Sequence, residues 1–517
     1  MMNFLLNYVI YLKGEFMKRL LDTRLKRQMC LVEELWDCQI FSMRRLSNNL
    51  NATEKTIRND IEYINSYMKG ISIAITSRIE VTLIKESWVS KSDLYAKILE
   101  SSNQFKIMES LFFEEFKSFD ELSSKNFVST SHVKRLVNQI NEVIQCYGAL
   151  ISPTFSIVGN QRSICQIMLN YMMERYGSVE VILGVEKSLL IEHVIEQFYS
   201  SNHQMKINQF SRHCLINKMK MHVYLMMERL KKGFKIHDFV PEYPYFHCQT
   251  IIDNFYQQFK TVFDIELTEF NISQLFYMCF LPYSKKCYLT IGMREEDFSS
   301  SRDIMAEIFC FIESIEDKLM KICPLKERLV NDIYWSSIQT LGVNHILYFR
   351  DKEFYLSLKS RYPVISGYLK EKLTEIFSKF QNLKHEDIDE MVYHAIFMLV
   401  TYWDDLLENI EQESMTLNAA LVMSTSFEHL SCLKDDIEYQ FRSKYNIKIF
   451  NPNNLKKIAK FNNMACVITD GTIPELRSFS VPVICISDIL DKDSSEKLIN
   501  LYLNEVKRNS QRVNILA

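Results

Sequence analysis

The stretch Thr53–Asn65, T-E-K-T-I-R-N-D-I-E-Y-I-N, constrains the fold more than any other part of the chain. Ile57, Ile61 and Ile64 recur at helical spacing, so this stretch predicts a helix with one apolar face. Thr53 is a residue type that favours the N-cap position, where its hydroxyl satisfies a backbone N–H group at the helix start. The segment is therefore expected to be an amphipathic helix that begins at Thr53.

A shorter apolar pattern lies just before this helix. Phe41, Leu46 and Leu50 mark a short helix, and the pair Asn51-Ala52 fits a tight turn. A short helix, a tight turn and a longer helix with polar residues at its start form a helix-turn-helix over about residues 41–68, a motif that places the first turns of its second helix in the DNA major groove. Residues 71–84 then alternate in polarity, which predicts the two-stranded hairpin of a winged helix-turn-helix.

The same arrangement recurs 76 residues later, where Thr53–Asn65 aligns with Ser129–Asn141, S-T-S-H-V-K-R-L-V-N-Q-I-N. The apolar positions keep their spacing, since Val133, Val137 and Ile140 stand in the places of the three isoleucines. Residues 148–160 alternate again and predict a second hairpin. Two copies in register, each followed by a hairpin, predict two winged helix-turn-helix domains, at residues 17–85 and 86–162.

The polar faces of the two predicted recognition helices supply the candidate DNA contacts. Cationic side chains suit phosphate, whereas arginine suits the edge of guanine and asparagine that of adenine. In the first domain the candidates are Arg44, Arg45 and Lys55 for phosphate, Thr53 at the helix start, and Thr56, Arg58 and Asn59 for base edges. In the second domain they are Ser131, His132, Lys134 and Arg135. Double-stranded DNA is the partner that this pattern predicts.

Composition excludes several other classes of protein. The formal net charge is −3 over 517 residues, so contacts with nucleic acid must come from local patches. The 13 cysteines include no C-x-x-C pair, and P-loop, H-E-x-x-H and G-x-S-x-G motifs are missing, so no cofactor, metal or enzymatic activity is predicted. The apolar run at residues 4–12 is too short for a membrane span and lacks the features of a signal peptide. We therefore expect a cytoplasmic protein without a membrane partner, in which residues 1–16 are a non-core extension.

The rest of the chain changes character twice. From about residue 163 to 412 the pattern is helical almost throughout. After about residue 415, short apolar runs alternate with helices, in the order 418–424, a helix to about Tyr445, 447–450, 466–469, 481–486 and a last helix over 490–507. Strands that alternate with helices predict a small parallel α/β sheet. The chain is thus expected to be mainly α, with a small α/β domain at its C-terminal end.

In this order of domains the chain resembles the Mga/AtxA family of transcriptional regulators of Gram-positive bacteria. The resemblance is most specific at T-I-R-N-D-I-E-Y-I-N and at Met221–Gly233, M-H-V-Y-L-M-M-E-R-L-K-K-G. The second stretch resembles a motif of PRDs, the regulation domains of the sugar phosphotransferase system (PTS), with His222, Arg229 and Gly233 at the motif positions. The resemblance implies all-helical PRD-like domains at 163–295 and 296–412, an EIIB-like α/β domain at 413–507 and a tail at 508–517.

In PRDs, histidines are phosphorylated by the phosphocarrier protein of the PTS, so the resemblance implies regulation by phosphohistidine. The first candidate is His222, with His213 as a substitute nine residues earlier. The second is His394 in the closing helix of the second PRD-like domain, and His345 is the nearest match in the front half of that domain. A histidine packed in the helical core is the alternative interpretation of His222.

The EIIB-like domain departs from the family pattern in one respect. A phosphoryl-carrying EIIB has a cysteine in the loop after its first strand, whereas this loop reads Ser424-Thr425-Ser426, and Cys432 lies in the following helix. The domain is therefore expected to serve docking or dimerisation.

Together these features imply a DNA-binding transcriptional regulator, more specifically an activator. It would be tuned by transient contact with the PTS phosphocarrier protein and would act as a homodimer or higher homo-oligomer. Two alternatives stay open, a PRD-type RNA-binding antiterminator and an interaction scaffold without DNA binding.

Overall fold

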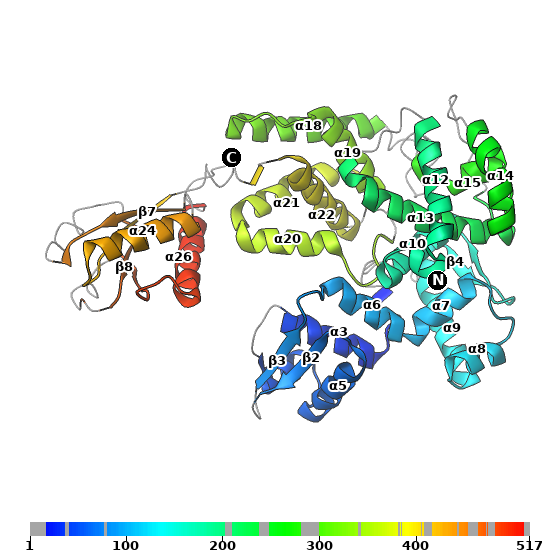
Figure 1. Cartoon of the computed structure of the whole chain (residues 1–517), viewed down its shortest axis with the longest axis horizontal. Helices are drawn as coiled ribbons and strands as arrows, with labels where there is room; N and C mark the ends of the chain where they lie inside the picture. Colours follow the sequence, from blue (N-terminus) through cyan, green and yellow to red (C-terminus); the bar gives the residue numbers. More distant parts are fainter. Residues whose placement is uncertain are drawn as a thin grey trace, which may run out of the picture. The chain divides into compact units, whose positions relative to one another are not determined.

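The computed structural model shows a mainly helical chain with a small parallel sheet near its C-terminus, as the sequence predicts (Figure 1). The structure describes residues 17–36, 41–76, 80–201, 209–236, 248–280, 299–339, 343–380, 383, 385–404, 406–407, 416–441, 444–452, 464–471, 473 and 481–510. The predicted extension 1–16 and most of the predicted tail lie outside these residues. Two compact units make up the chain: Met1–Phe298 with Ile338–Arg350 and Lys384–Asp387, and Ser299–Ser337 with Asp351–Leu383 and Ile388–Ala517.

The first helix-turn-helix lies at the start of the first unit. Its elements are α3 (Thr23–Trp36), β1 (Phe41–Ser42), α4 (Met43–Asn49), α5 (Glu54–Tyr67), β2 (Ile71–Ile75) and β3 (Glu80–Lys85). The strands form an antiparallel sheet in the order β1-β3-β2, so the predicted hairpin is present. The prediction that Phe41 belongs to a helix is wrong. Phe41 pairs with Val81 in the sheet, because Ser42 caps α4 and the helix starts only at the next residue.

The second helix-turn-helix follows in the same unit. Its elements are α6 (Lys91–Ser101), α7 (Asn103–Phe112), α8 (Phe119–Asn126), α9 (Thr130–Ile144), β4 (Ala149–Ile151) and β5 (Ile157–Gly159). The predicted apolar positions of α9 are all buried. The two strands pair antiparallel, with Ile151 opposite Ile157. At the base of this hairpin, Gly159 has a φ of +119°, and a Cβ atom there would lie 2.3 Å from the carbonyl oxygen of Gly148, so only glycine fits.

Helices make up the rest of the first unit. They are α10 (Gln161–Tyr176), α11 (Glu180–Leu183), α12 (Val185–Ser201), α13 (Gln209–Lys231), α14 (Gln249–Phe263), α15 (Glu269–Leu275) and α16 (Tyr277–Phe280). The long helix α13 contributes to two hydrophobic cores. Met221 and Leu225 pack with the core of the helix-turn-helix units, whereas Val223 and Met226 pack with the core of α12, α14 and α15. Helix α13 therefore joins the two helix-turn-helix motifs of this unit to its other helices.

The second unit is built largely from α18 (Ser299–Leu319), α19 (Lys326–Gln339), α20 (Arg350–Arg361), α21 (Pro363–Phe377) and α22 (His385–Tyr402). The chain between α19 and α20 belongs to the first unit, where it packs on α10. The Asn170 side chain donates to the carbonyl of Val343 at 2.5 Å. The Glu174 carboxylate accepts hydrogen bonds from the backbone N–H groups of Ile346, Leu347 and Tyr348, at 2.5, 2.8 and 3.2 Å. We call Val343–Tyr348 the docked segment.

The predicted α/β region closes the second unit. Its elements are β6 (Leu417–Leu421), α24 (Phe427–Phe441), β7 (Tyr445–Ile449), β8 (Cys466–Thr469), β9 (Val483–Cys485) and α26 (Lys492–Ser510). The strands lie in the order β7-β6-β8-β9 and all pair in parallel, as predicted. The prediction that the helix continues to about Tyr445 is wrong. Tyr445 starts β7, where its ring is buried and its hydroxyl donates to the carbonyl of Leu498 at 2.8 Å.

Candidate nucleic-acid interface

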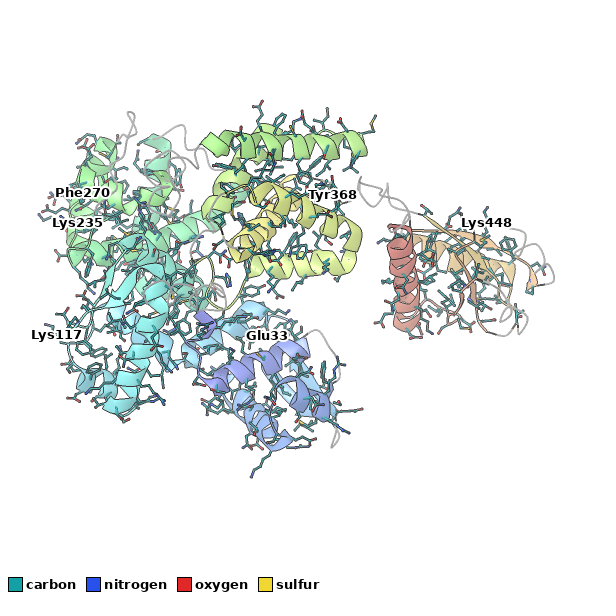
Figure 2. The ribbon with its side chains drawn as sticks, turned by 180° about the vertical axis from the view of Figure 1, so that it is seen from behind. Glu33, Lys117, Lys235, Phe270, Tyr368 and Lys448 are labelled. Atoms are coloured by element: carbon teal, nitrogen blue, oxygen red, sulfur yellow. The ribbon has the colours of Figure 1, made fainter. Side chains whose placement is uncertain are left out.

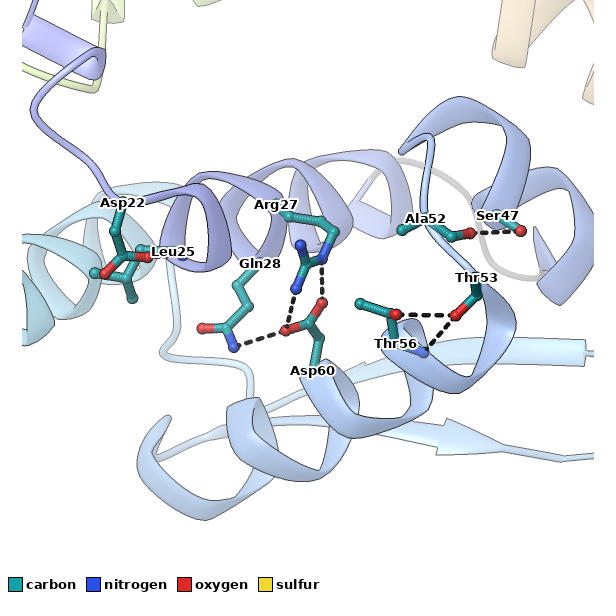
Figure 3. Close-up of polar contacts among 9 residues, drawn as sticks. All are labelled: Asp22, Leu25, Arg27, Gln28, Ser47, Ala52, Thr53, Thr56 and Asp60. Carbon is teal, nitrogen blue, oxygen red and sulfur yellow. Dashed lines mark hydrogen bonds and ion pairs between the residues drawn. The ribbon is translucent and has the colours of Figure 1, made fainter.

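The turn of the first helix-turn-helix is fixed by local hydrogen bonds (Figure 3). The Ser47 hydroxyl at the end of α4 donates to the carbonyl of Ala52 at 2.6 Å. Asn51 between them has a φ of +46°, a left-handed conformation that asparagine tolerates better than most residues. Thr53 caps α5 as predicted, because its hydroxyl accepts the backbone N–H of Thr56 at 3.2 Å. The start of the recognition helix is therefore held in one orientation.

The second turn repeats these bonds at the positions that the 76-residue shift predicts. The Ser123 hydroxyl donates to the carbonyl of Val128 at 2.5 Å, as Ser47 does to Ala52. Phe127 takes the place of Asn51 and also has a positive φ, +52°. Ser129 caps α9 by accepting the backbone N–H of His132 at 3.3 Å. The similarity of the two units thus extends from sequence to the individual hydrogen bonds of the turn.

Each recognition helix is also tied to its hairpin through an asparagine at equivalent positions. In the first helix-turn-helix, the Asn65 side chain accepts the N–H of Ile73 at 2.7 Å and donates to the carbonyl of Ile73 at 2.9 Å. In the second helix-turn-helix, the Asn141 side chain accepts the N–H of Ile151 at 2.8 Å. The hairpins therefore keep a fixed position relative to the helices that would enter the groove.

Most of the predicted contact residues of the first helix-turn-helix are exposed to solvent. Arg44, Arg45, Thr53, Lys55 and Asn59 are exposed, whereas Thr56 and Arg58 are half-buried. The Arg45 guanidinium lies 4.6 Å from the centroid of the Phe41 ring, which limits its freedom. The Thr56 hydroxyl is 2.9 Å from that of Thr53, so this predicted base reader also takes part in the cap.

The second helix-turn-helix presents a similar surface on the first turns of α9. Ser131, Lys134 and Arg135 are exposed and His132 is half-buried. Arg135 Nη2 lies 2.9 Å from His132 Nδ1, so these two candidates form a pair. Lys134 Nζ lies 5.3 Å from the centroid of the Phe119 ring on α8. Cations and hydrogen-bonding groups thus gather where a recognition helix contacts DNA.

Sequence reasoning missed the role of Asp60 on α5. Its side chain is buried and bonds to Arg27 Nε at 2.5 Å, to Arg27 Nη2 at 3.2 Å and to Gln28 Nε2 at 3.1 Å, which fixes α5 to α3 (Figure 3). The signal was present in the sequence, because Asp60 lies on the same helical face as Ile57, Ile61 and Ile64. A carboxylate in an apolar stripe requires a partner.

The candidate histidine of α13, His222, lies in the core of the first unit. Its side chain is 1% exposed, and the ring packs edge-on against Tyr277 at 5.0 Å between centroids. Among the residues that the structure describes, neither ring nitrogen has a hydrogen-bond partner. Burial lowers the pKa of His222 to about 3, so the imidazole is neutral at physiological pH. His213 lies on the same helix, with its side chain outside the described residues.

The candidate histidines farther along the chain have polar partners. His394 Nδ1 lies 2.7 Å from Asp351 Oδ2, and about one fifth of the His394 side chain is exposed. His345 lies in the docked segment, with Nδ1 2.5 Å from Asn344 Oδ1 and its ring stacked on Phe349 at 4.4 Å.

The loop after β6 contains the residues that replace the EIIB cysteine. The backbone N–H of Ser424 donates to Asp470 Oδ2 at 3.3 Å, and Thr425 Oγ1 lies 3.0 Å from His429 Nδ1. Cys432 lies within α24, as predicted. The loop therefore presents hydroxyl groups and no thiol.

Comparisons with known proteins agree with this geometry. The model of the Mga helix-turn-helix domain matches residues 88–172, which contain the second helix-turn-helix, α6 to β5, and most of α10. Over 461 residues, 85% of this chain and 90% of the relative, the chain is 21% identical to a candidate trans-acting regulator of Streptococcus pneumoniae serotype 4. Over 206 residues, 38% of this chain and 40% of the relative, it is 24% identical to the capsule synthesis positive regulator AcpA of Bacillus anthracis. No helix in the described ranges is long and apolar enough to cross a membrane. The chain thus contains a match to the Mga helix-turn-helix domain and is similar to regulators of the Mga/AtxA type.

Proposed function

We propose that this regulator is a transcriptional activator that binds promoter DNA through both winged helix-turn-helix units. The observation that carries the proposal is the repeated turn, in which cap, left-handed residue and serine bond recur, with the second copy inside the matched domain. Exposed cations such as Lys55 and Lys134 lie in the first turns of both recognition helices, where they would neutralise phosphates. Activation is favoured because one relative is named a positive regulator.

A gel-shift assay tests DNA binding by the full-length chain. Combined Arg58→Ala and Lys134→Ala should weaken binding to promoter fragments selected from the source genome by about tenfold or more, since each lost contact costs ~1–3 kcal/mol. The matched control is Lys187→Ala with Lys235→Ala. It removes the same charge from exposed sites outside both helix-turn-helix motifs. Of these two lysines, Lys235 lies over the Phe270 ring (Figure 2). Equal binding by both variants would favour the scaffold alternative.

We also propose that histidine phosphorylation by the PTS phosphocarrier protein tunes activity. His394 has the more suitable geometry, because the Asp351 carboxylate at Nδ1 favours the tautomer whose Nε2 carries the lone pair. The Nε2 atom is buried although about one fifth of the side chain is exposed, so a local movement of α22 has to expose it to the phosphocarrier protein. A phosphoryl group there would add about −1.5 to −2 charge between α20 and α22 and weaken their packing. Phosphorylation of His222 requires α13 to move first, since that side chain is buried. His213 remains a substitute.

Reporter assays separate the two main candidates. At a genuine phosphorylation site, replacement by Asp adds a permanent charge and replacement by Ala prevents modification, so the two variants should differ in output. We expect this difference for His394→Asp and His394→Ala and a smaller one for the same changes at His222. Wild-type output from all four variants would contradict regulation by these histidines.

Dimerisation through the α/β region is the third part of the proposal. This region exposes the large apolar side chains of Phe427, Tyr439 and Ile489, which is unusual unless a partner covers them. Removing the residues after about 412 should therefore lower the mass measured by light scattering. An unchanged mass would assign the oligomer interface to another part of the chain.

A further inference from the structure

Arg229, near the end of α13, is a buried cation that donates hydrogen bonds to neutral oxygens at the hairpin of the second helix-turn-helix and at the start of α10. Its side chain is 1% exposed, and among the described residues no carboxylate forms an ion pair with it. Nη2 donates to the carbonyl of Ile157 in β5 at 2.7 Å and to Gln161 Oε1 at 2.8 Å, and Nε donates to the same amide at 3.0 Å. Burial lowers the pKa of Arg229 to about 10, so the group stays charged at neutral pH.

A buried charge without a counter-ion is costly, so the position of this guanidinium depends strongly on the groups that surround it. Besides the two oxygens, it lies 3.5 Å from the centroid of the Phe234 ring and 5.3 Å from that of Phe112 on α7. The neighbouring Lys232 donates to the carbonyl of Phe113. The end of α13 is therefore fixed to the hairpin, to the start of α10 and to α7.

From Ile157 a chain of backbone contacts leads to the recognition helix α9. Ile157 is paired with Ile151 on the neighbouring strand, and the N–H of Ile151 donates to Asn141 Oδ1 on α9 at 2.8 Å. The base of the hairpin is closely packed around Gly159, so β4 and β5 move together. A displacement of Arg229 would thus be passed to α9 through two strands and one side chain.

We propose that Arg229 is a positioning residue for the recognition helix α9, through β5, β4 and Asn141. Because α13 also packs in the core of α12, α14 and α15, a rearrangement of that helical region would change the orientation of α9. The proposal rests on the proposed DNA binding of the second helix-turn-helix. It adds the residue through which the helices α12, α14 and α15 would control that binding.

The test uses the full-length chain, Arg229→Met, Asn141→Ala and the double variant. The control is Lys220→Met on the same helix. Lys220 is also buried but pairs with Glu180 and, at 2.9 Å, with Glu192, so its replacement removes a buried cation of α13 whose ion pairs lie away from the hairpin. DNA affinity is measured by anisotropy with the genomic duplex recovered in the gel-shift selection. Hydrogen exchange over residues 130–159 is measured on the free protein.

Arg229→Met should reduce affinity by about tenfold, within the usual range of coupling between sites, and should increase exchange over residues 130–159. The double variant should bind no more weakly than the weaker single variant, since both changes interrupt one connection. Lys220→Met should leave affinity and this exchange unchanged.

The proposal is overturned if the fold-losses of DNA affinity in Arg229→Met and Asn141→Ala multiply in the double variant. It is also overturned if Lys220→Met loses as much DNA affinity as Arg229→Met. Wild-type exchange over residues 130–159 in Arg229→Met would also overturn it, and that measurement needs no DNA. Failure of the wild-type chain to bind the duplex would instead contradict the proposed function.

Discussion

Phe127 occupies a turn position for which its residue type is unfavourable. It has a positive φ and is 95% exposed, whereas Asn51 holds the equivalent position in the first unit. A left-handed conformation costs a residue with a bulky side chain roughly 1 kcal/mol, and asparagine less. Phe127→Asn should therefore raise the free energy of unfolding by about 0.5–1 kcal/mol in a urea titration. The reverse change, Asn51→Phe, should lower it by a similar amount, and a loss of stability in Phe127→Asn would contradict the argument.

His222 should make the first unit sensitive to acid. Its pKa is about 3 in the folded chain and 6.5 without burial, so the unfolded chain binds a proton first as the pH falls. The neutral, buried His222 therefore contributes fully to the free energy of unfolding above pH 6.5. This contribution is lost progressively as the pH falls towards 3. Between about pH 7.5 and pH 5 the loss amounts to about 2 kcal/mol. His222→Leu should remove this part of the pH dependence in urea titrations, and parallel curves for the two proteins would contradict it.

Among the elements, the docked segment Val343–Tyr348 depends most clearly on one side chain. The Glu174 carboxylate accepts three backbone N–H groups, and burial raises its pKa to about 7. Glu174→Ala would leave three buried donors without an acceptor, at a cost of about 3 kcal/mol or more. We expect fast hydrogen exchange at Ile346, Leu347 and Tyr348 in this variant. Glu186→Ala, at an exposed site on α12, is the control, and equal protection in both variants would assign the docking to apolar packing alone.

The elements also show what a sequence can predict. The caps at Thr53 and Ser129 and the spacing of the apolar residues were predictable, because these signals act within a few neighbouring residues. The bonds of Glu174 to Leu347 and of Arg229 to Ile157 join residues 173 and 72 positions apart, and no local pattern marks them. The sequence wrongly predicts helix at Phe41 and Tyr445, because strands of a few residues carry too little periodicity to be recognised.

At the scale of the whole molecule, the DNA-binding part does not complete its own core. Met221 and Leu225 of α13, with Val343, Ile346 and Leu347 of the docked segment, are buried in the same cluster as the residues of α5 and α9. Under the proposed function, this arrangement would let distant parts of the chain act on DNA binding through a shared core. It also predicts that the matched domain, 88–172, depends on these distant segments for its stability.

Truncation tests this dependence on distant segments. A fragment of residues 17–176 lacks all five of those side chains, and each large apolar residue lost from a core costs about 2 kcal/mol or more. The sum is comparable with the ~5–15 kcal/mol that stabilises a typical folded domain. The fragment should therefore keep helical circular dichroism but bind a hydrophobic dye and unfold without a cooperative transition. A fragment of residues 17–350 restores α13 and the docked segment, so it should recover cooperative unfolding. Cooperative unfolding of 17–176 would instead show that the helix-turn-helix units fold alone, and control by the helical region would then have to act through the hydrogen bonds of Arg229.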